Sequence, residues 1–333
     1  MTNEAVPPPS APDLQGSRIG IYKLEQLLGQ GGMGAVYRAR SEAGREVAIK
    51  VLLEGRATQP DVRTRFQREW SVLEKIVHTN VVRLIDFPRS KEGPLYYVME
   101  LLSGQSLAER LEVEKLPLVD ALTLFAELAK GLCAVHEAGI VHRDIKPQNI
   151  FLCDAKEAAA GFTAKILDFG FARVVGSQIT GSGLLVGTPA YAAPEQASGD
   201  KVDVRVDVYA LGLVMYKVLT GQHPFSTDDQ VATLGHQLLS PPPPLSWLDD
   251  EVPIALEALV LRMLRKRPED RPQSMQEVEQ LLAQFAHADV AEDSPFEDRP
   301  SNPIDDRYGP LNPLAERLVN STLVKKGFRR EKK

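Results

Sequence analysis

The sequence has few cysteines, and their spacing fits neither a metal site nor a disulfide framework. Only two of its 333 residues are cysteine, Cys133 and Cys153, and both lie in apolar stretches. Such sparse cysteine use is typical of proteins whose thiols stay reduced inside the cell. We therefore interpret both thiols as reduced core residues, and we expect a cytoplasmic location.

An excess of positive charge, a secretory signal and a long apolar run are also missing. The formal net charge is −6, which argues against nucleic acid as the main partner because binding to a phosphate backbone needs a basic surface. The proline-rich residues 1–13 lack the basic start and the apolar run of a signal peptide. No apolar stretch approaches the roughly 18 residues of a membrane span. We therefore expect no transmembrane segment in this chain.

The two ends of the chain have compositions that cannot form a core. Residues 1–18 are rich in proline and small residues, and residues 286–333 are first acidic and then basic, so we predict disorder in both. The second stretch also permits a short basic amphipathic helix that contacts a membrane, although a solvated tail is favoured; the leucines concerned are Leu314, Leu318 and Leu323.

Residues 19–285 have the composition and periodicity of a packed domain with two lobes. With 43% hydrophobic residues the chain can form a sizeable core. Apolar residues recur with a period of two up to residue 102 and with a period of about 3.6 from there on. Strands are predicted at 22–28, 35–40, 46–51, 81–87 and 95–101, and helices at 61–78, 116–138, 228–239, 254–264 and from Val206 onward. The helix at 61–78 should bury Phe66, Trp70, Leu73 and Val77 on one face.

A polar cluster in the helical lobe, residues 142–149, has side chains that suit phosphoryl transfer. Asp144 can accept a hydroxyl proton, Lys146 can neutralise a phosphate oxygen, and Asn149 can offer a carbonyl oxygen to a hard cation. Alone, such a run is as compatible with a solvated loop. Further on, a short buried strand ends in a second carboxylate, Asp168, and Gly170 then lets the backbone turn.

The strand-rich lobe contains a glycine-rich hairpin and a lysine on the next strand. Glycine residues let backbone amides approach a phosphate without an intervening side chain, although a flexible turn has the same composition. A dinucleotide-binding fold would need a helix directly after the glycines, and here a strand follows. On the strand at 46–51, Lys50 lies among apolar residues, where it is either a phosphate ligand or a solvated edge residue.

Together these motifs resemble those of the eukaryotic-type protein kinases. The chain has H-R-D-x-x-x-x-N at 142–149, D-F-G at 168–170 and V-A-I-K at 47–50. The G-T-P-A-Y-x-A-P-E-Q run at 187–196 is similar to that of bacterial serine/threonine kinases in particular. The resemblance covers residues 19–285 and implies an α+β fold with a small five-stranded antiparallel N-lobe, residues 19–102, with one main helix. A larger, mostly helical C-lobe, residues 103–285, would follow.

The resemblance implies how ATP would be bound. Lys50 would hold the α- and β-phosphates and pair with Glu69, although Glu74 lies on the same predicted helix. The phosphates would be covered by Gly29, Gly31, Gly32 and Gly34. The adenine pocket would be lined by Leu28, Val36, Ala48, Met99, Phe151 and Leu167, with the backbone of Glu100 to Leu102 as hinge.

The resemblance also implies the catalytic roles. Asn149 and Asp168 would bind Mg²⁺, or Mn²⁺ in its place. Asp144 would be the base that orients the acceptor hydroxyl, with Lys146 on the transferred group. The substrates would be serine or threonine residues of proteins, and a transient homodimer would allow phosphorylation in trans.

An activation segment would run from Asp168 to Glu195. Arg143 would pair with a phosphate on Thr180 or, second, on Ser182. The hydroxyl of Thr188 would instead have a structural role near Asp144, and a threonine there goes with serine/threonine specificity. Ala192 departs from the family, which often has a bulkier side chain at this position.

Buried polar contacts would hold this arrangement together. Asp207 would accept hydrogen bonds from the catalytic-loop backbone, and Arg271 would pair with Glu195. Residues 154–161 would be a surface insertion without an assigned role. The four prolines at 241–244 are either a polyproline ligand or, as we favour, a rigid connector.

Two other classes of protein share parts of this pattern. A pseudokinase scaffold usually lacks one of four residues, all of which this chain has: Lys50, Asp144, Asn149 and Asp168. A small-molecule phosphotransferase would normally lack the A-P-E segment end and the arginine that pairs with it. The sequence thus favours an active protein kinase.

Overall fold

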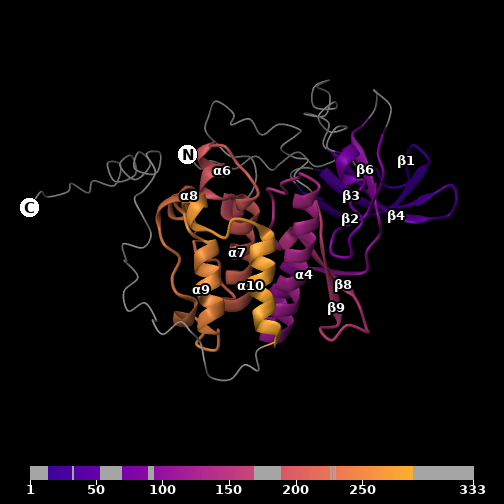
Figure 1. Ribbon diagram of the computed structural model, residues 1–333. Helices are drawn as coiled ribbons and strands as arrows, with labels where there is room; N and C mark the ends of the chain where they lie inside the picture. Colours follow the sequence, from indigo (N-terminus) through magenta and orange to yellow (C-terminus); the bar gives the residue numbers. More distant parts are fainter. Residues whose placement is uncertain are drawn as a thin grey trace, which may run out of the picture.

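The computed structural model of the chain describes residues 14–31, 34–52, 70–88, 94–168, 189–225, 227 and 230–287. They form a sheet-rich lobe and a helical lobe that lie side by side (Figure 1). This two-lobed α+β architecture is the predicted one. The expected disorder of residues 1–13 and 288–333 falls outside the described residues.

The small lobe is built on one antiparallel sheet with the strand order β1-β2-β3-β4-β6-β5. Its strands are β1 (Arg18–Ile19), β2 (Tyr22–Gly31), β3 (Gly34–Ser41), β4 (Glu46–Leu52), β5 (Leu84–Asp86) and β6 (Tyr96–Met99). The five predicted strands are present, and β1 is an additional short edge strand. Residues 14–18, which we expected to be disordered, are part of the described structure, since Leu14 packs against the core and Arg18 pairs with Lys23.

The helix of the small lobe ends earlier than its periodicity predicts. Trp70, only 1% exposed, anchors its last described turn and lies 4.9 Å from the ring of Phe87. Helical conformation stops at Leu73, which breaks the phase of the apolar face. Ile76 is therefore buried, whereas Val77, predicted to be buried, is 78% exposed. Phe66 lies outside the described residues.

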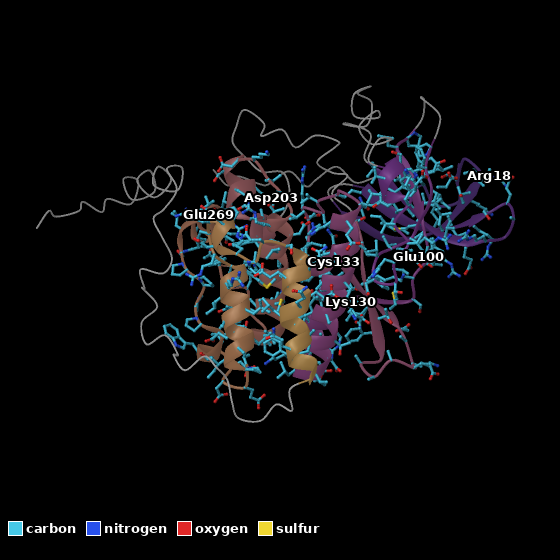
Figure 2. The ribbon with its side chains drawn as sticks, viewed as in Figure 1. Arg18, Glu100, Lys130, Cys133, Asp203 and Glu269 are labelled. Carbon is cyan, nitrogen blue, oxygen red and sulfur yellow. The ribbon has the colours of Figure 1, made fainter. Side chains whose placement is uncertain are left out.

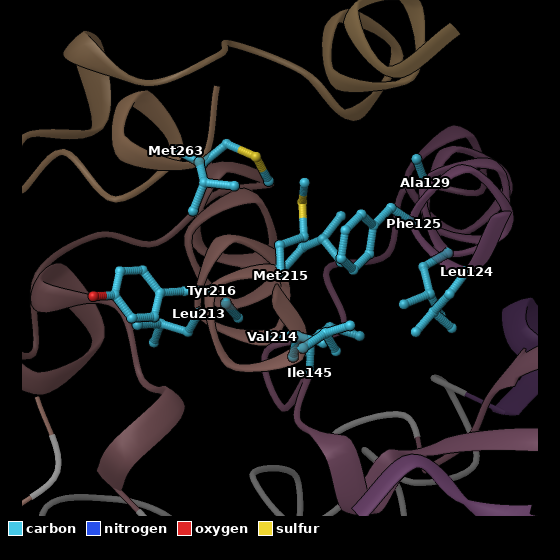
Figure 3. Packing of buried hydrophobic residues seen from close by; sticks show 14 of the residues in the cluster. Leu124, Phe125, Ala129, Ile145, Leu213, Val214, Met215, Tyr216 and Met263 are labelled. Carbon is cyan, nitrogen blue, oxygen red and sulfur yellow. The ribbon is translucent and has the colours of Figure 1, made fainter. Parts of the chain in front are cut away.

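The large lobe consists mainly of helices. They are α3 (Leu107–Val113), α4 (Leu118–Glu137), α6 (Pro194–Ser198), α7 (Arg205–Thr220), α8 (Gln230–Leu239), α9 (Ile254–Met263) and α10 (Met275–His287). Helix α7 is buried along almost its whole length, which explains why its sequence is apolar on every side. Met215 of α7 points toward Phe125 of α4, with Met263 of α9 on the other side (Figure 3). Gly139 has a positive φ of 78° two residues after α4 and so ends this helix.

A small sheet of β7 (Gly104–Ser106), β8 (Ile150–Asp154) and β9 (Phe162–Ile166) lies beside α4. The insertion at 154–161 forms the turn between β8 and β9, where Ala155 N donates to Gly161 O at 3.0 Å. In the other proline-rich stretch, Pro242 and Pro244 are buried and Tyr216 donates to Pro243 O at 3.1 Å, which favours a connector over an accessible ligand.

The two cysteines differ in burial. Cys133, labelled on α4 in Figure 2, is buried and donates its thiol to Glu279 at 3.4 Å. Cys153 is only partly buried, because residues of β8 alternate between the core and the surface, so its interpretation as a core residue was wrong. Burial raises the pKa of Cys133 to about 12 and that of Cys153 to about 11, so both thiols are protonated near neutral pH. Neither is part of a disulfide.

No helix in the described ranges combines the length and the hydropathy that a membrane crossing requires.

A buried ion pair joins two distant parts of the large lobe. The Arg271 guanidinium, fully buried, contacts both carboxylate oxygens of Glu195, at 2.7 and 2.8 Å. Its remaining donors contact the backbone oxygens of Arg265, Lys266 and Arg205. This is the predicted pair, and a bidentate contact of this kind fixes both orientation and distance.

Because both charges are out of water, neutralising one should leave the other uncompensated. We expect Glu195→Gln to lower the free energy of unfolding by about 3–5 kcal/mol. The control is Glu269→Gln, which removes an exposed ion pair with Arg267 and should change stability little. Chemical denaturation of the two variants checks this, and equal losses would contradict it.

Candidate active site

Asp207, at the first turn of α7, holds the backbone of the polar cluster. Its side chain is fully buried and accepts hydrogen bonds from His142 N at 2.8 Å and Arg143 N at 2.7 Å. His136 Nε2 lies 2.8 Å from the same carboxylate. Arg143 has a φ of 65°, a conformation that non-glycine residues adopt only where the surroundings enforce it. The expected contact between Asp207 and this loop is therefore present.

The polar cluster converges on the carboxylate of Asp144. Lys146 Nζ contacts its two oxygens at 3.0 and 2.9 Å, and Asn149 Nδ2 donates to Oδ2 at 2.8 Å. Asn149 also donates to the backbone oxygen of Asp144 at 2.8 Å. The side chain of Asp144 thus has a defined orientation within this cluster.

A second carboxylate, Asp168, follows β9 and is held by two residues of the small lobe. Lys50 of β4 forms an ion pair with one carboxylate oxygen, and Tyr97 of β6 donates its hydroxyl to the other. Lys50 and Tyr97 are neighbours in the sheet, where they pair across β4 and β6. Asp168 has a positive φ of 49°, as Arg143 does.

The charge state of Asp168 follows from competing effects. Burial alone would raise the pKa of Asp168, but the Lys50 ammonium and the hydrogen bonds from Lys50 and Tyr97 outweigh it and keep the pKa below its usual value. Burial and the nearby carboxylate raise the pKa of Tyr97 well above its usual value. Near neutral pH the pair is therefore an ionised carboxylate and a protonated phenol.

The glutamate expected to pair with Lys50 is Glu69, which lies outside the described residues. The alternative, Glu74, is exposed and accepts a hydrogen bond from Trp70 Nε1 at 3.0 Å. Because this bond orients the Glu74 carboxylate toward its own helix, Glu74 is the weaker candidate for Lys50.

The glycine hairpin joins β2 to β3 next to Lys50. Gly31 pairs with Gly34 at its tip, while Gly32 lies outside the described residues. A Cβ at Gly34 would lie 2.1 Å from Val51 O, so only glycine fits there. A Cβ at Gly29 or Gly31 would meet nothing within 4 Å. The space beside these two glycines suits a ligand that approaches the backbone.

Most of the predicted adenine-pocket residues belong to one apolar cluster. Ala48 and Met99 are buried in it and pair across β4 and β6. Val36, Leu102 and Leu167 pack against the same cluster. Phe151, on β8, is partly buried outside it, and Leu28 is exposed.

Glu100, in the predicted hinge, is committed to the protein by its side chain. Its carboxylate accepts from Lys165 Nζ at 2.9 Å and Arg83 N at 2.8 Å, and it is labelled in Figure 2. Its own N–H donates to Arg83 O at 3.0 Å. A bound base would therefore meet its carbonyl oxygen.

The end of the predicted activation segment lies against the polar cluster. Gln196 donates to Arg143 O at 3.2 Å and accepts from Ala193 N at 2.9 Å. Residues 169–188, which include Thr180, Ser182 and Thr188, lie outside the described residues.

Sequence reasoning missed Tyr97. Nothing in a buried strand of apolar and aromatic residues indicates which tyrosine reaches a charged group. One signal was available, because Tyr97 faces the same side of the sheet as its partner Lys50 on the neighbouring strand.

The comparisons with known proteins agree with this site. Residues 22–283 match the protein kinase domain family. The chain therefore belongs to the protein kinase family. Its domain is that of a serine/threonine protein kinase, to judge from its relatives. Serine/threonine-protein kinase Pkn1 of Myxococcus xanthus is 41% identical over 261 residues, 78% of this chain and 37% of that protein. Serine/threonine-protein kinase pkn2 of the same organism is 39% identical over 283 residues, 83% and 34% respectively.

A solved structure extends the likeness to three dimensions. The chain superposes on the crystal structure of the PknI kinase domain of Mycobacterium tuberculosis with a TM-score of 0.65 and 26% identity, covering 82% of this chain and 98% of that chain. The chain spans about a third of the length of the two curated relatives it matches.

We expect Tyr97→Phe to lower the free energy of unfolding by about 1–3 kcal/mol, because the buried Asp168 carboxylate loses a hydrogen-bond donor. Tyr96→Phe is the matched control, since Tyr96 is the next residue of β6 and faces the opposite core cluster. Chemical denaturation of both variants checks this. The same loss in both variants would show that the contact between Tyr97 and Asp168 contributes nothing of its own.

Proposed function

We propose that this chain transfers the γ-phosphoryl group of ATP to serine and threonine hydroxyls of proteins. The observation that carries the proposal is the Asp144 carboxylate, oriented by Lys146 and Asn149 and joined by the catalytic loop to Asp168. The last link is His142 Nε2, which lies 2.8 Å from Leu167 O.

Asp144 would accept the proton of the acceptor hydroxyl and orient its oxygen toward the phosphorus atom. Lys146, now 2.9 Å from Asp144, would bind the transferred group and leave the carboxylate free for the hydroxyl. Lys50 would bind the α- and β-phosphates under the glycine hairpin. In such a reaction the protein contributes mainly position and charge neutralisation.

The donor set fits Mg²⁺. Asp168 is an ionised carboxylate, and Asn149 uses its nitrogen on Asp144, so that its oxygen remains for a cation. One or two protein oxygens together with substrate phosphates are typical Mg²⁺ ligands. Bound Mg²⁺ would neutralise charge on the phosphates, and Mn²⁺ is expected to replace it.

Transfer of radiolabelled phosphate from ATP tests the function. We expect label on the protein itself and on dephosphorylated casein, as phosphoserine or phosphothreonine. A protein that binds ATP but labels neither would be a pseudokinase, and label on small alcohols alone would indicate a small-molecule phosphotransferase.

Asp144→Asn should lower turnover by a factor on the order of 10² or more, because the base is lost, while ATP affinity changes little. Asp250→Asn, an exposed carboxylate of the same lobe, is the control. Initial rates and nucleotide titrations measure both effects. Near-normal turnover of Asp144→Asn would remove this residue from the role of base.

The pair between Lys50 and Glu69 remains part of the proposal. We expect Glu69→Ala to reduce transfer far more than Glu74→Ala, because Glu74 is bonded to Trp70. Initial rates of the two variants measure this, and equal reductions would exclude Glu69.

The finer proposals concern regulation and location. Phosphorylation of Thr180 or Ser182 would add a dianion that pairs with Arg143, whose side chain is exposed beside the catalytic loop. Mass spectrometry of the wild type should find phosphate there and none in Asp144→Asn. A fully active enzyme without phosphate between residues 168 and 195 would end this proposal. Cell fractionation tests the cytoplasmic location, and cross-linking tests a transient homodimer for phosphorylation in trans.

A further inference from the structure

The backbone of residues 190–193 is held by two side chains from other parts of the large lobe. Ala190 O accepts from His223 Nε2 at 2.8 Å and from Gln237 Nε2 at 2.8 Å. The same nitrogen of Gln237 donates to Ala192 O at 2.7 Å. Two consecutive outward turns of this short segment are thereby fixed by one residue of α8 and one residue of the loop after α7.

The tautomer of His223 is defined by its surroundings. Phe225 N donates to His223 Nδ1 at 3.2 Å, so Nε2 has the proton that Ala190 O accepts. Burial lowers the pKa of His223 to about 4, so the ring is neutral near pH 7. Its edge packs on Tyr191, with the ring centroids 5.1 Å apart at 78°.

Gln237 is fully buried, and its orientation is set by the two carbonyl groups that it contacts. Within the described part of the chain, its Oε1 has no hydrogen-bond partner. A buried amide oxygen without a partner is costly, so an apolar residue would serve stability at least as well. What Gln237 provides in return is the pair of donors to the segment.

The position of Gln237 is itself fixed from below. Its backbone oxygen accepts from Lys266 Nζ at 2.7 Å, and this ammonium lies 3.9 Å from the ring centroid of Phe225. Lys266 thus links α8 to the loop that carries His223.

The held segment is also in register with the catalytic loop. Gln196 connects Ala193 N to Arg143 O, one residue before Asp144. A shift of the segment would therefore change the distance between whatever lies on it and the Asp144 carboxylate.

We propose that His223 and Gln237 are positioning residues for the protein acceptor, because they fix the segment beside Asp144 against which the acceptor peptide lies. This inference rests on the proposed function. Neither residue touches the predicted ATP site, so their loss should affect binding of the protein acceptor and leave ATP binding nearly unchanged.

The test uses the full 333-residue chain, radiolabelled ATP and dephosphorylated casein. Gln237→Leu removes both donors at similar volume, and His223→Phe keeps the aromatic contact but removes its donor. The control is His236→Gln, on the same helix, whose imidazole contacts only Ser240 among the side-chain contacts described. Thermal unfolding and ATP titration check that each variant is folded.

We expect the KM for casein to rise about fivefold to tenfold in Gln237→Leu, the effect of one or two lost hydrogen bonds, and less in His223→Phe. The KM for ATP should stay within about twofold of the wild type in both, as for the control. Because Ala190 O keeps one donor in each single variant and none in the double variant, the double variant should lose more than the sum of the two on a logarithmic scale.

Several outcomes overturn the inference. An unchanged KM for casein would do so, and so would an equal rise in the KM for ATP, which indicates a merely structural role. If Gln237→Leu does not fold, His223→Phe decides alone. A wild-type protein that binds ATP without labelling casein or itself would overturn the proposed function, and this inference with it.

Discussion

The site depends on one carboxylate that water never reaches. Asp207 is buried at the start of the apolar helix α7, where an ionised group without partners would be far too costly. Its partners are the amides of His142 and Arg143 and the ring of His136. The catalytic loop therefore cannot leave its place without uncovering a buried charge, and this requirement also maintains the left-handed conformation of Arg143. Rigidity at this point makes the geometry around Asp144 reproducible.

The elements that periodicity and turn chemistry define could be predicted from the sequence. The five strands, the long helix α4 and the end of this helix at Gly139 follow from local patterns. Val77 shows the limit, because the turn after Leu73 depends on packing around Trp70 and not on the apolar spacing. Cys153 shows another, since an apolar stretch does not reveal which side of β8 faces the core.

The candidate site could be predicted as a set of residues, but not as a set of contacts. Motif spacing identified Lys50, Asp144, Asn149 and Asp168, since each is fixed by its place in a recurring pattern. That Tyr97 contacts Asp168, and that Gln237 contacts the segment after the D-F-G run, depends on pairing between strands and on packing between helices far apart in the sequence. Such contacts leave no local trace, because an interior tyrosine or glutamine has the same neighbours in the chain whether or not it reaches a partner.

The small lobe does not end where the strand pattern ends. Val82 N donates to Ile166 O and Ile166 N donates to Asn80 O, so β9 of the large lobe completes hydrogen bonds of the small one. Val135 of α4 is likewise part of the apolar cluster below the small sheet. The two lobes consequently share a core and a strand, and a cut at residue 102 would leave each part with exposed apolar surface and unpaired backbone groups. In evolutionary terms the lobes are not exchangeable modules, because a new small lobe would have to arrive with a matching β9 and α4.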